Sequence, residues 1–479
     1  MTTAAESGTN SGRMKLGLAL SGGGFRASFF HLGVLAQMAM RGLLRRVEVI
    51  STVSGGSIIG ALYYLHLKRL LESESDTDLT DGHYQQMVER IERDFFAAVQ
   101  TNFRMSTFAD PAANYRMRQP NYSRSDYLAE LYNDRLYRGV LPGLDHSIKM
   151  RELTILPKGT SSAFQPESDN PGRSAKVPIL LINASTLNTG RNWRFAAERM
   201  GEPPREDVLS KEIDRKAIRL RRPPSYTEIP PHQVNFTLGH AVAASACVPG
   251  IFHPLAVSGL YRDPETGGEI RVELVDGGVH DNQGIQGLLD QVCTHFVVSD
   301  ASKQLDADHN PETDFGPVLG RASAISQDRV REEQLFRLLG ATDRSCIAFM
   351  DLRAGLTTRA IAWLGRDGQP AAASQFLRPT LSAPDFHVDE RVQALVSGIR
   401  TDLDSFTEVE ACTLMADGYL MSAPELTKLA ESVSGRPGGS ARPVEVGPPA
   451  WGFLKINPWV ERPNDAYIKQ IEVASQQFL

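Results

Sequence analysis

Short apolar runs alternate with helical periodicity in the first 70 residues of the chain. Residues 14–20 are apolar and end in Ser21-Gly22-Gly23-Gly24. Apolar side chains at a helical spacing follow, and Gly42 is a helix stop signal. A second apolar, β-branched run over residues 47–53 ends at Ser54-Gly55-Gly56, and another helical pattern comes after it. This strand–helix–strand–helix order predicts an α/β fold with a largely parallel sheet.

The alternation of strand and helix patterns stops between about residue 70 and residue 175, a stretch that we interpret as a helical insertion. Strand patterns return over 177–186, 273–275 and 296–299, and a small-residue helix is expected over 239–247. The predicted organisation has three parts. They are a disordered N-terminus over 1–13, an α/β domain over 14–350 that carries the insertion, and a mainly helical C-terminal extension over 351–479, packed on that domain or appended to it.

Composition narrows the class of protein. The chain has 479 residues, of which 41% are hydrophobic and 23% charged, so it can bury a core. Its formal net charge of −6 argues against a dedicated nucleic-acid binder. Four widely spaced cysteines, with no CxxC pair, exclude a disulfide scaffold and a zinc ribbon.

The apolar runs are too short for a membrane span, which needs roughly 18 to 20 apolar residues. The N-terminus is polar and lacks the apolar core of a cleavable secretory signal. We therefore expect a cytoplasmic or peripheral membrane protein, and export without a cleavable signal stays open.

The glycine loop Gly22-Gly23-Gly24, followed by Arg26, stands between a predicted strand and a predicted helix. Glycines expose backbone N–H groups at a helix N-terminus, which favours an anion such as a phosphate or an oxyanion. The loop also matches the dinucleotide fingerprint G-x-G-x-x-A. That interpretation is disfavoured, because the only acid in the second strand is Glu48, near its start.

The turn Thr52-Val53-Ser54-Gly55-Gly56 has the layout of a nucleophile elbow. Small neighbours let the serine hydroxyl stand exposed above the sheet, and the helix that begins there favours a developing negative charge. Thr52 occupies the position of the first elbow glycine. Ser57 is a second candidate nucleophile, and Ser54 is favoured because Ile59 occupies the second glycine position for Ser57.

A serine nucleophile needs a base. Asp276 ends a predicted strand and is followed by Gly277 and Gly278, a place where α/β sheets position functional groups. The residues alone leave two arrangements open: a Ser54–Asp276 dyad, or a triad that includes His280 or His253.

Five sequence blocks, in this order, resemble the patatin-like phospholipases, a group that includes the catalytic domain of cytosolic phospholipase A. The blocks are SGGGFRASFFHLGVL, STVSGGSIIGAL, INASTLNTGRNWRF, AVAASACVPGIFHPL and VDGGVHDNQG. The resemblance covers residues 15–300 and implies a three-layer α/β sandwich with a central, mostly parallel sheet. It also implies a Ser54–Asp276 dyad without histidine, and an oxyanion hole formed by Gly22, Gly23 and Gly24 with Arg26 as helper.

The function implied by the resemblance is a serine lipid acyl hydrolase that cleaves phospholipid or other lipid esters without metal or cofactor. An acyltransferase with the same dyad, or a non-catalytic lipid- or dinucleotide-binding module, is the alternative. We expect no nucleic-acid partner, and the sequence names no protein activator. Two stretches could meet a membrane surface: the arginine- and aromatic-rich residues 103–127, and a basic run of Arg215, Lys216, Arg219, Arg221 and Arg222.

Overall fold

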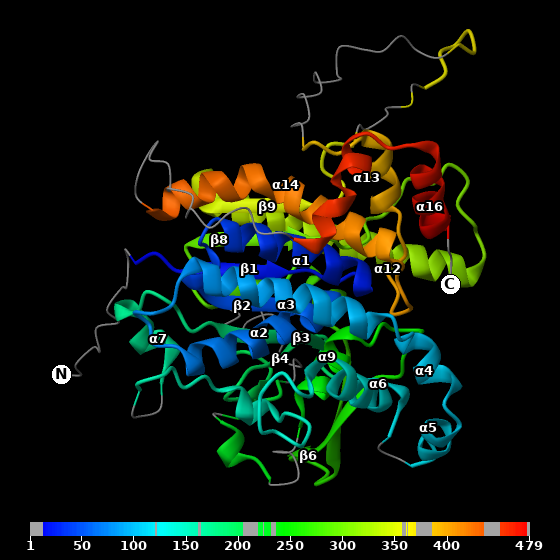
Figure 1. The fold of residues 1–479 in the computed structure, drawn as a ribbon. Coiled ribbons are helices and arrows are strands. Elements are labelled where there is room, and N and C mark those ends of the chain that lie inside the picture. The colour runs from blue at the N-terminus through cyan, green and yellow to red at the C-terminus, as the bar shows by residue number, and fades with distance from the viewer. Residues whose placement is uncertain are drawn as a thin grey trace, which may run out of the picture.

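The computed structural model describes residues 13–119, 122–160, 164–204, 219–223, 225–230, 236–356, 361, 363–369, 386–434 and 451–476. Within these residues one nine-stranded sheet forms the centre of the molecule. Its main path runs in the order β5-β4-β3-β2-β1-β8-β9, and Figure 1 shows most of this stack. The strands are β1 (Leu16–Leu20), β2 (Val47–Val53), β3 (Ile179–Thr186), β4 (Asn192–Phe195), β5 (Met200–Gly201), β6 (Leu255–Arg262), β7 (Glu269–Asp276), β8 (His295–Asp300) and β9 (Ile347–Asp351).

The five strands from β3 to β9 on this path are parallel, and the remaining pairings are antiparallel. Side chains alternate between the two faces, as the pleat requires. In β1, Leu18 and Leu20 enter the larger core, whereas Ala19 enters the smaller core on the other face. A sheet buried on both faces explains why its strands appear in the sequence as nearly continuous apolar runs.

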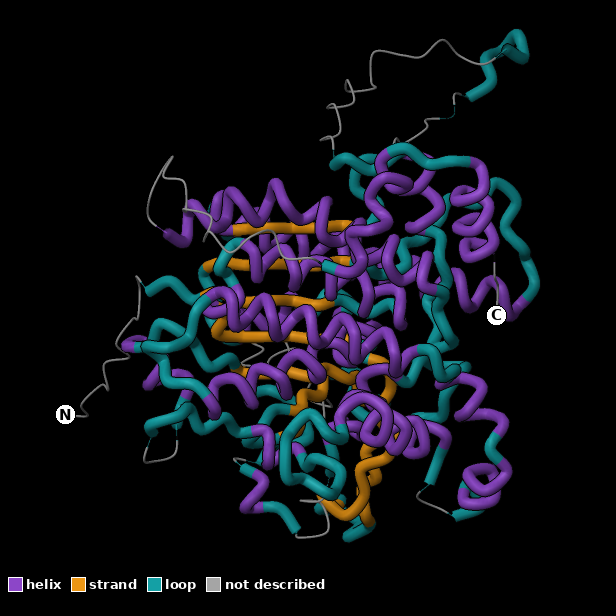
Figure 2. The backbone as a smooth tube through the Cα atoms, in the orientation of Figure 1, coloured by secondary structure: helices purple, strands orange, loops and turns teal. Residues whose placement is uncertain are grey.

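Helices cover both faces of the sheet (Figure 2). Those before β3 are α1 (Gly24–Met40), α2 (Gly55–Ser73), α3 (Asp81–Val99), α4 (Phe103–Ala109), α5 (Pro111–Arg116), α6 (Arg124–Tyr132), the π-helical turn η2 (Asn133–Tyr137) and α7 (Pro166–Asp169). The later ones are α9 (Leu238–Ala246), α10 (Gly278–Asp281), α11 (Ile285–Asp290), α12 (Phe315–Ala341), α13 (Glu390–Ser397), α14 (Glu408–Ser434), α15 (Asn457–Glu461) and α16 (Asp465–Gln476).

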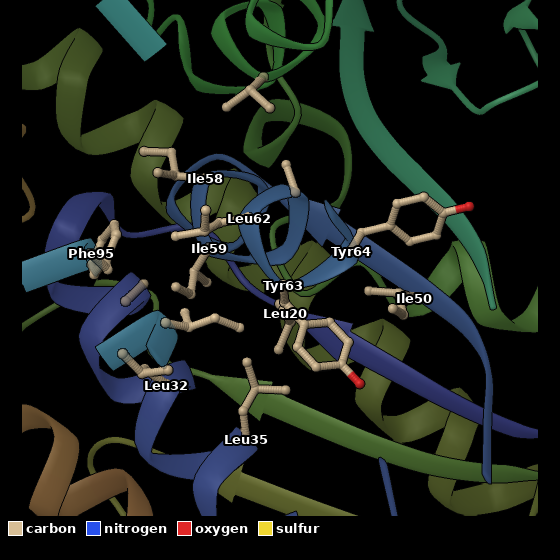
Figure 3. Close-up of a cluster of buried hydrophobic side chains, with 14 of the residues drawn as sticks. Leu20, Leu32, Leu35, Ile50, Ile58, Ile59, Leu62, Tyr63, Tyr64 and Phe95 are labelled. Carbon is tan, nitrogen blue, oxygen red and sulfur yellow. The ribbon is translucent and has the colours of Figure 1, made fainter. Parts of the chain in front are cut away.

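The larger core lies between β1, β2 and the helices α1, α2 and α3. Figure 3 shows Leu32 and Leu35 of α1 close to Leu20 of β1, with Ile59 and Leu62 of α2 nearby. The smaller core, on the opposite face, holds Ile285 and Leu288 of α11 and Leu338 of α12. The molecule is thus an α/β sandwich with a mostly parallel central sheet, and the predicted fold class is confirmed.

The predicted elements lie within a few residues of their observed positions. Helix α3 of the insertion begins at Asp81, because Thr80 and His83 form a reciprocal cap at its N-terminus. The insertion is helical, as expected, from α3 to η2. Residues 1–12, which belong to the predicted disordered N-terminus, lie outside the described residues.

The C-terminal region contributes to the main core. Helix α14 crosses α1 so closely that a Cβ atom built on Gly33 would lie 2.0 Å from the carbonyl oxygen of Met415. On the partner helix, a Cβ atom on Gly418 would lie 2.2 Å from the carbonyl oxygen of Phe30. The proposed boundary near residue 350 between a domain and an extension stays a prediction.

Candidate active site

Strand topology brings Ser54 and Asp276 together. Strand β2 ends at Val53, opposite Asn183 of β3, whereas β7 runs the other way and ends at Asp276, opposite Ala184. Both strands lie on the same side of β3, because β4 occupies its other side. Their carboxyl ends therefore meet end to end, and the residue after β2 is the serine.

Ser54 occupies a strained turn between β2 and α2. Its φ of 49° and ψ of −118° are unfavourable for a residue with a side chain. The backbone is held there because the Ser54 N–H donates to Ser245 Oγ at 2.9 Å, and Ser245 Oγ donates to the Asn183 carbonyl at 2.6 Å. A serine in this conformation at a strand-to-helix turn has the geometry of a nucleophile elbow.

The glycines after Ser54 allow the elbow to touch the glycine loop. A Cβ atom at Gly55 would lie 2.1 Å from the Gly24 carbonyl oxygen, and one at Gly56 would lie 2.3 Å from the Leu20 carbonyl oxygen. The Gly56 N–H donates to the Ser21 carbonyl at 3.0 Å. Only glycine fits at these two positions without a shift of backbone.

Thr52 is accommodated at the first elbow position by a glycine one helix turn into α2. A Cβ atom at Gly60 would lie 2.6 Å from Thr52 Cγ2. The Thr52 hydroxyl donates to the Leu181 carbonyl and accepts a hydrogen bond from the Ser57 hydroxyl at 2.9 Å. Ser57 is fully buried in this network, which favours Ser54 over Ser57 as the nucleophile.

The Asp276 carboxylate is buried and has two donors beside it. The Gly278 N–H donates to Asp276 Oδ1 at 2.7 Å, and the Ser54 hydroxyl lies near enough to lower the pKa of the carboxylate. Burial raises the pKa of Asp276 to about 6, against the opposing effect of these two donors. The group is therefore a stronger base than a solvated aspartate.

Close backbone packing holds Asp276 in place. The Asp276 N–H donates to the Cys247 carbonyl at 3.0 Å, and the Gly277 N–H donates to the Ser245 carbonyl at 3.1 Å. A Cβ atom at Gly277 would lie 2.3 Å from the Asn183 carbonyl oxygen. The small residues of α9 and the glycine after Asp276 thus serve close packing, and Ser245 links the base to the elbow.

Three backbone N–H groups near Ser54 make no hydrogen bond in the described structure. Those of Gly23, Gly24 and Gly55 donate to no acceptor within the described part of the chain. The Gly22 N–H instead donates to the Asn282 carbonyl at 3.0 Å, and a Cβ atom at Gly22 would lie 3.2 Å from Ser54 Cβ. The N-termini of α1 and α2 meet here, and their dipoles favour a negative charge.

In the described structure the Arg26 side chain makes no hydrogen bond to the glycine loop. Its guanidinium is buried and donates to the carbonyls of Ala301, Ser397 and Ile399 at 2.9 to 3.1 Å. Burial lowers the pKa of Arg26 to about 10, so the group stays charged at neutral pH. Its position is that of an anchor between α1 and the C-terminal region.

Sequence reasoning missed part of the site. It assigned Gly55 to the elbow only, although the N–H after a nucleophile is a regular oxyanion donor. It also missed Ser245, Asn282 and Asp402; the carbonyl of Asp402 accepts the Phe25 N–H at 3.1 Å. The strict VDGGVHDNQG spacing contained a signal for Asn282, whereas no sequence signal marked Asp402.

The predicted membrane contacts are only partly placed. Arg215 and Lys216 lie outside the described residues, whereas Arg221 is exposed and Arg222 is half-buried. In the stretch over 103–127, Arg116 lies over the Tyr122 ring and pairs with Glu130, and Arg124 lies over the Phe108 ring. These arginines already have aromatic or acidic partners within the protein.

No group of three or more His, Cys, Asp or Glu side chains in the described ranges is placed to bind a metal ion. Likewise, the helices that the structure describes include none with the length and apolar character of a membrane span.

Comparison with known proteins places the motifs in a family. The family model of patatin-like phospholipases matches residues 18–289, which is more than half of the chain. No curated protein matches the sequence.

Solved structures give distant similarities. Human GIVD cytosolic phospholipase A2 is similar over 88% of this chain and 63% of its own, at 12% identity and a TM-score of 0.44. The same human protein in complex with methyl gamma-linolenyl fluorophosphonate is similar over 88% of this chain and 58% of its own, at 13% identity and a TM-score of 0.43. VipD from Legionella pneumophila is similar over 88% of this chain and 67% of its own, at 12% identity and a TM-score of 0.30. The present chain thus spans less than two thirds of the human protein's length.

Proposed function

Because the chain belongs to the patatin-like phospholipase family, we propose that it is a serine lipid acyl hydrolase of the phospholipase A or lysophospholipase type. Its substrate would be a carboxylic ester of a membrane lipid. The observation that supports this most is the placement of Ser54 at a strained elbow beside the buried Asp276 carboxylate, whose pKa the Ser54 hydroxyl lowers. Unused N–H groups of Gly23, Gly24 and Gly55 lie beside it.

The proposed first half-reaction transfers the acyl group to the enzyme. Asp276 accepts the proton of Ser54 while Ser54 Oγ bonds to the ester carbonyl carbon. The negative charge that forms on the carbonyl oxygen is stabilised by the N–H groups of the glycine loop and Gly55. When the tetrahedral intermediate collapses, the bond to the alcohol oxygen breaks and Asp276 returns its proton to that oxygen. A lysolipid or glycerol derivative leaves, and an acyl-Ser54 ester remains.

The second half-reaction is hydrolysis of the acyl-enzyme. Asp276 takes a proton from water, and the hydroxide oxygen bonds to the acyl carbon at the same oxyanion site. Collapse breaks the bond to Ser54 Oγ, which regains the proton from Asp276, and a fatty acid is released. Each donor of an oxyanion hole typically contributes about 2.7 to 4 kcal/mol to transition-state stabilisation.

Lipid hydrolysis by matched variants tests this proposal. Ser54→Ala is expected to abolish fatty-acid release from purified phospholipid, whereas Ser57→Ala keeps most of it; circular dichroism checks that both variants are folded. Full activity in Ser54→Ala would contradict the proposal. Added lysolipid or alcohol, with product analysis, distinguishes hydrolysis from acyl transfer to another acceptor.

We further propose that the protein meets its substrate as a peripheral membrane protein, through the N-terminal half of α12. That half carries exposed apolar side chains: Phe315 (84% exposed), Val318, Leu319 and Ile325. They lie on one side of the helix, and the other side, with Arg321 and Ala324, lines a cavity of about 460 Å³. A soluble monomer rarely exposes such a stripe, and a bilayer surface would cover it.

The position of α12 favours a bilayer over other occupants of this stripe. The helix packs on α10, which directly follows Asp276 and Gly277. Asn282, which contacts the glycine loop, also lines the cavity under α12. The helix that carries the apolar stripe therefore packs beside the segment that follows Asp276. Ion pairs of Arg331 with Asp300 and Asp351 hold the other half of the helix to the sheet.

A further inference from the structure

A cavity of about 530 Å³ lies away from the candidate active site, between α2, α3, η2 and the segment that follows η2. Its floor consists of the buried residues Leu62, His66, Leu136 and Val140. Because α2 begins directly after Ser54 and rises about 1.5 Å per residue, His66 lies roughly 18 Å along the helix from the nucleophile. The volume is in the range of small-molecule sites.

Arginines dominate the rim of this cavity. The lining includes five of them, against the single acid Asp94: Arg69, Arg90, Arg93, Arg135 and Arg138. This is a local excess of positive charge in a chain whose formal net charge is −6. Helical spacing explains the arrangement, since residues 62, 66 and 69 share one face of α2, and residues 90, 93 and 94 share one face of α3.

The protein itself satisfies only part of this charge. Arg138 pairs with Asp134 at 3.0 Å, and Arg135 donates to Ser106 Oγ and lies over the Phe103 ring. Arg90 and Arg93 have no hydrogen-bond or ion-pair partner in the described part of the chain. Two guanidinium groups on neighbouring turns of α3 are therefore available to an anion.

His66 provides a second, independent sign of a ligand. Its side chain is only 5% exposed, and its Nε2 atom is buried without a hydrogen-bond partner among the described residues. A buried polar atom without a partner is costly in a native protein. Burial, together with the charges of Arg90 and Arg69, lowers the pKa of His66 to about 4, so the neutral ring can donate from Nε2.

We infer that this arginine-lined cavity is a binding site for an anion that carries two or more phosphate groups. Guanidinium groups bind phosphate oxygens through paired, charge-assisted hydrogen bonds, and several of them converge here. The neutral His66 ring at the floor would donate to an oxygen that enters the cavity. The phosphates belong either to a free small molecule or to a lipid head group, since both present the same oxygens. This site is separate from the Ser54–Asp276 pair and does not depend on the proposed hydrolase activity.

Titration calorimetry of the full chain with inorganic triphosphate at low salt tests the inference. We expect one site per chain, an affinity that falls as salt increases, and at least a tenfold loss of affinity in Arg90→Gln/Arg93→Gln. The matched control is Arg262→Gln/Arg337→Gln, which removes the same charge from exposed positions outside the cavity. Equal weakening in the two double variants would show a general charge effect and overturn the inference.

Two further measurements complete the test. Vesicles of phosphatidylcholine with phosphatidylinositol bisphosphate, sedimented with and without competing triphosphate, show whether a lipid head group occupies the same site. Binding of either probe that depends on Arg90 and Arg93 supports the inference, and binding of neither probe contradicts it. Nuclear magnetic resonance of the imidazole should also show the pKa of His66 rising on binding, because the anion offsets the nearby arginines. An unchanged His66 signal at saturating triphosphate would contradict the placement of His66 in the binding site.

Discussion

At the scale of single residues, the candidate site depends on one carboxylate kept out of water. Burial is the main cause of the raised pKa of Asp276. The Gly278 N–H and the Ser54 hydroxyl oppose this shift. A base with a pKa near the working pH transfers protons efficiently, and this environment brings an aspartate closer to that condition. In the proposed mechanism the carboxylate is the only base, and His31, a fully buried histidine near the loop, is hydrogen-bonded to Ser299 and to the Ser21 carbonyl.

The pH dependence of ester hydrolysis should report Asp276. The base must be ionised, so kcat/KM is expected to be highest above pH 6 and to fall as pH decreases through an apparent pKa of about 6. In Ser54→Ala the carboxylate loses a donor that lowers its pKa, so its titration, followed by infrared spectroscopy, should move to higher pH. A flat profile between pH 5 and pH 7 would show that Asp276 is not the base.

The residues that meet at the candidate site were largely marked in the sequence, but their contacts were not. Local strand–turn–helix patterns singled out Ser54, Asp276 and the glycines, and only the family resemblance chose Asp276 as the base. The roles of Gly22 and Arg26 depend on partners far along the chain: the carbonyls of Asn282, Ala301, Ser397 and Ile399. Backbone carbonyls have no sequence signature, so such contacts become visible only in the folded structure.

At the scale of elements, glycines set how closely the helices approach. The crossing of α1 and α14 leaves no room for a methyl group at Gly33 or Gly418. Periodicity predicted α1 well, but it gave no partner for Gly33. The sequence pattern also could not show that the ends of β2 and β7 meet, because this depends on which strands pair with β3.

Gly33→Ala is expected to lower the free energy of unfolding by about 1 to 3 kcal/mol through overpacking against α14. The matched control is Gly320→Ala on α12, where the added Cβ atom would meet nothing within 4 Å. Alanine is better than glycine in an open helix position by roughly 0.8 to 1 kcal/mol, so this control should be neutral or stabilising. Denaturant unfolding measures both. Equal stability of the two variants would mean that the helices do not cross this closely.

The apolar stripe of α12 makes a separate prediction about membranes. Phe315→Asp/Leu319→Asp should reduce sedimentation with phospholipid vesicles severalfold, because two exposed apolar anchors become charged. Hydrolysis of a short-chain, water-soluble ester should be unchanged, since neither residue contacts Ser54 or Asp276. Leu156→Asp, at a half-exposed position near the far end of α2, is the control. Unaltered vesicle binding in the double variant would show that α12 does not contact the membrane.

At the scale of the whole molecule, the C-terminal region is part of the site's support although it carries no recognised motif. The carbonyl of Asp402 accepts the Phe25 N–H, and a Cβ atom at Gly24 would lie 2.7 Å from the backbone of Thr401 and Asp402. Arg26 ties the same helix end to residues 397 and 399. The glycine loop is therefore braced by a segment more than 370 residues away in the sequence.

Arg26→Gln tests this support. We expect a lower melting temperature and at least a tenfold slower reaction of Ser54 with a fluorophosphonate, because three buried carbonyls lose their donor and the loop loses its brace. Arg46→Gln is the comparison, since Arg46 donates to the Val433 carbonyl of α14 far from the site. It should lower stability modestly and leave the labelling rate unchanged. If Arg26→Gln reacts as fast as the parent protein, the C-terminal segment does not position the loop.

The net charge of −6 conceals the distribution of charge over the molecule. It argues against a globally basic binder, yet a cavity with five arginines lies between α2 and α3. Only the packing of two helices and the segment after η2 collects these residues in one place. Charge summed over a sequence therefore says little about any single surface.

The central claim is that Ser54 is a nucleophile activated by Asp276, and covalent labelling tests it most directly. The purified protein is reacted with a fluorophosphonate, and the modified peptide is located by mass spectrometry. One adduct per chain on Ser54 is predicted, lost in Ser54→Ala, strongly slowed in Asp276→Asn, and retained in Ser57→Ala. Labelling that persists in Ser54→Ala, or a folded parent protein that does not react at all, would contradict the claim.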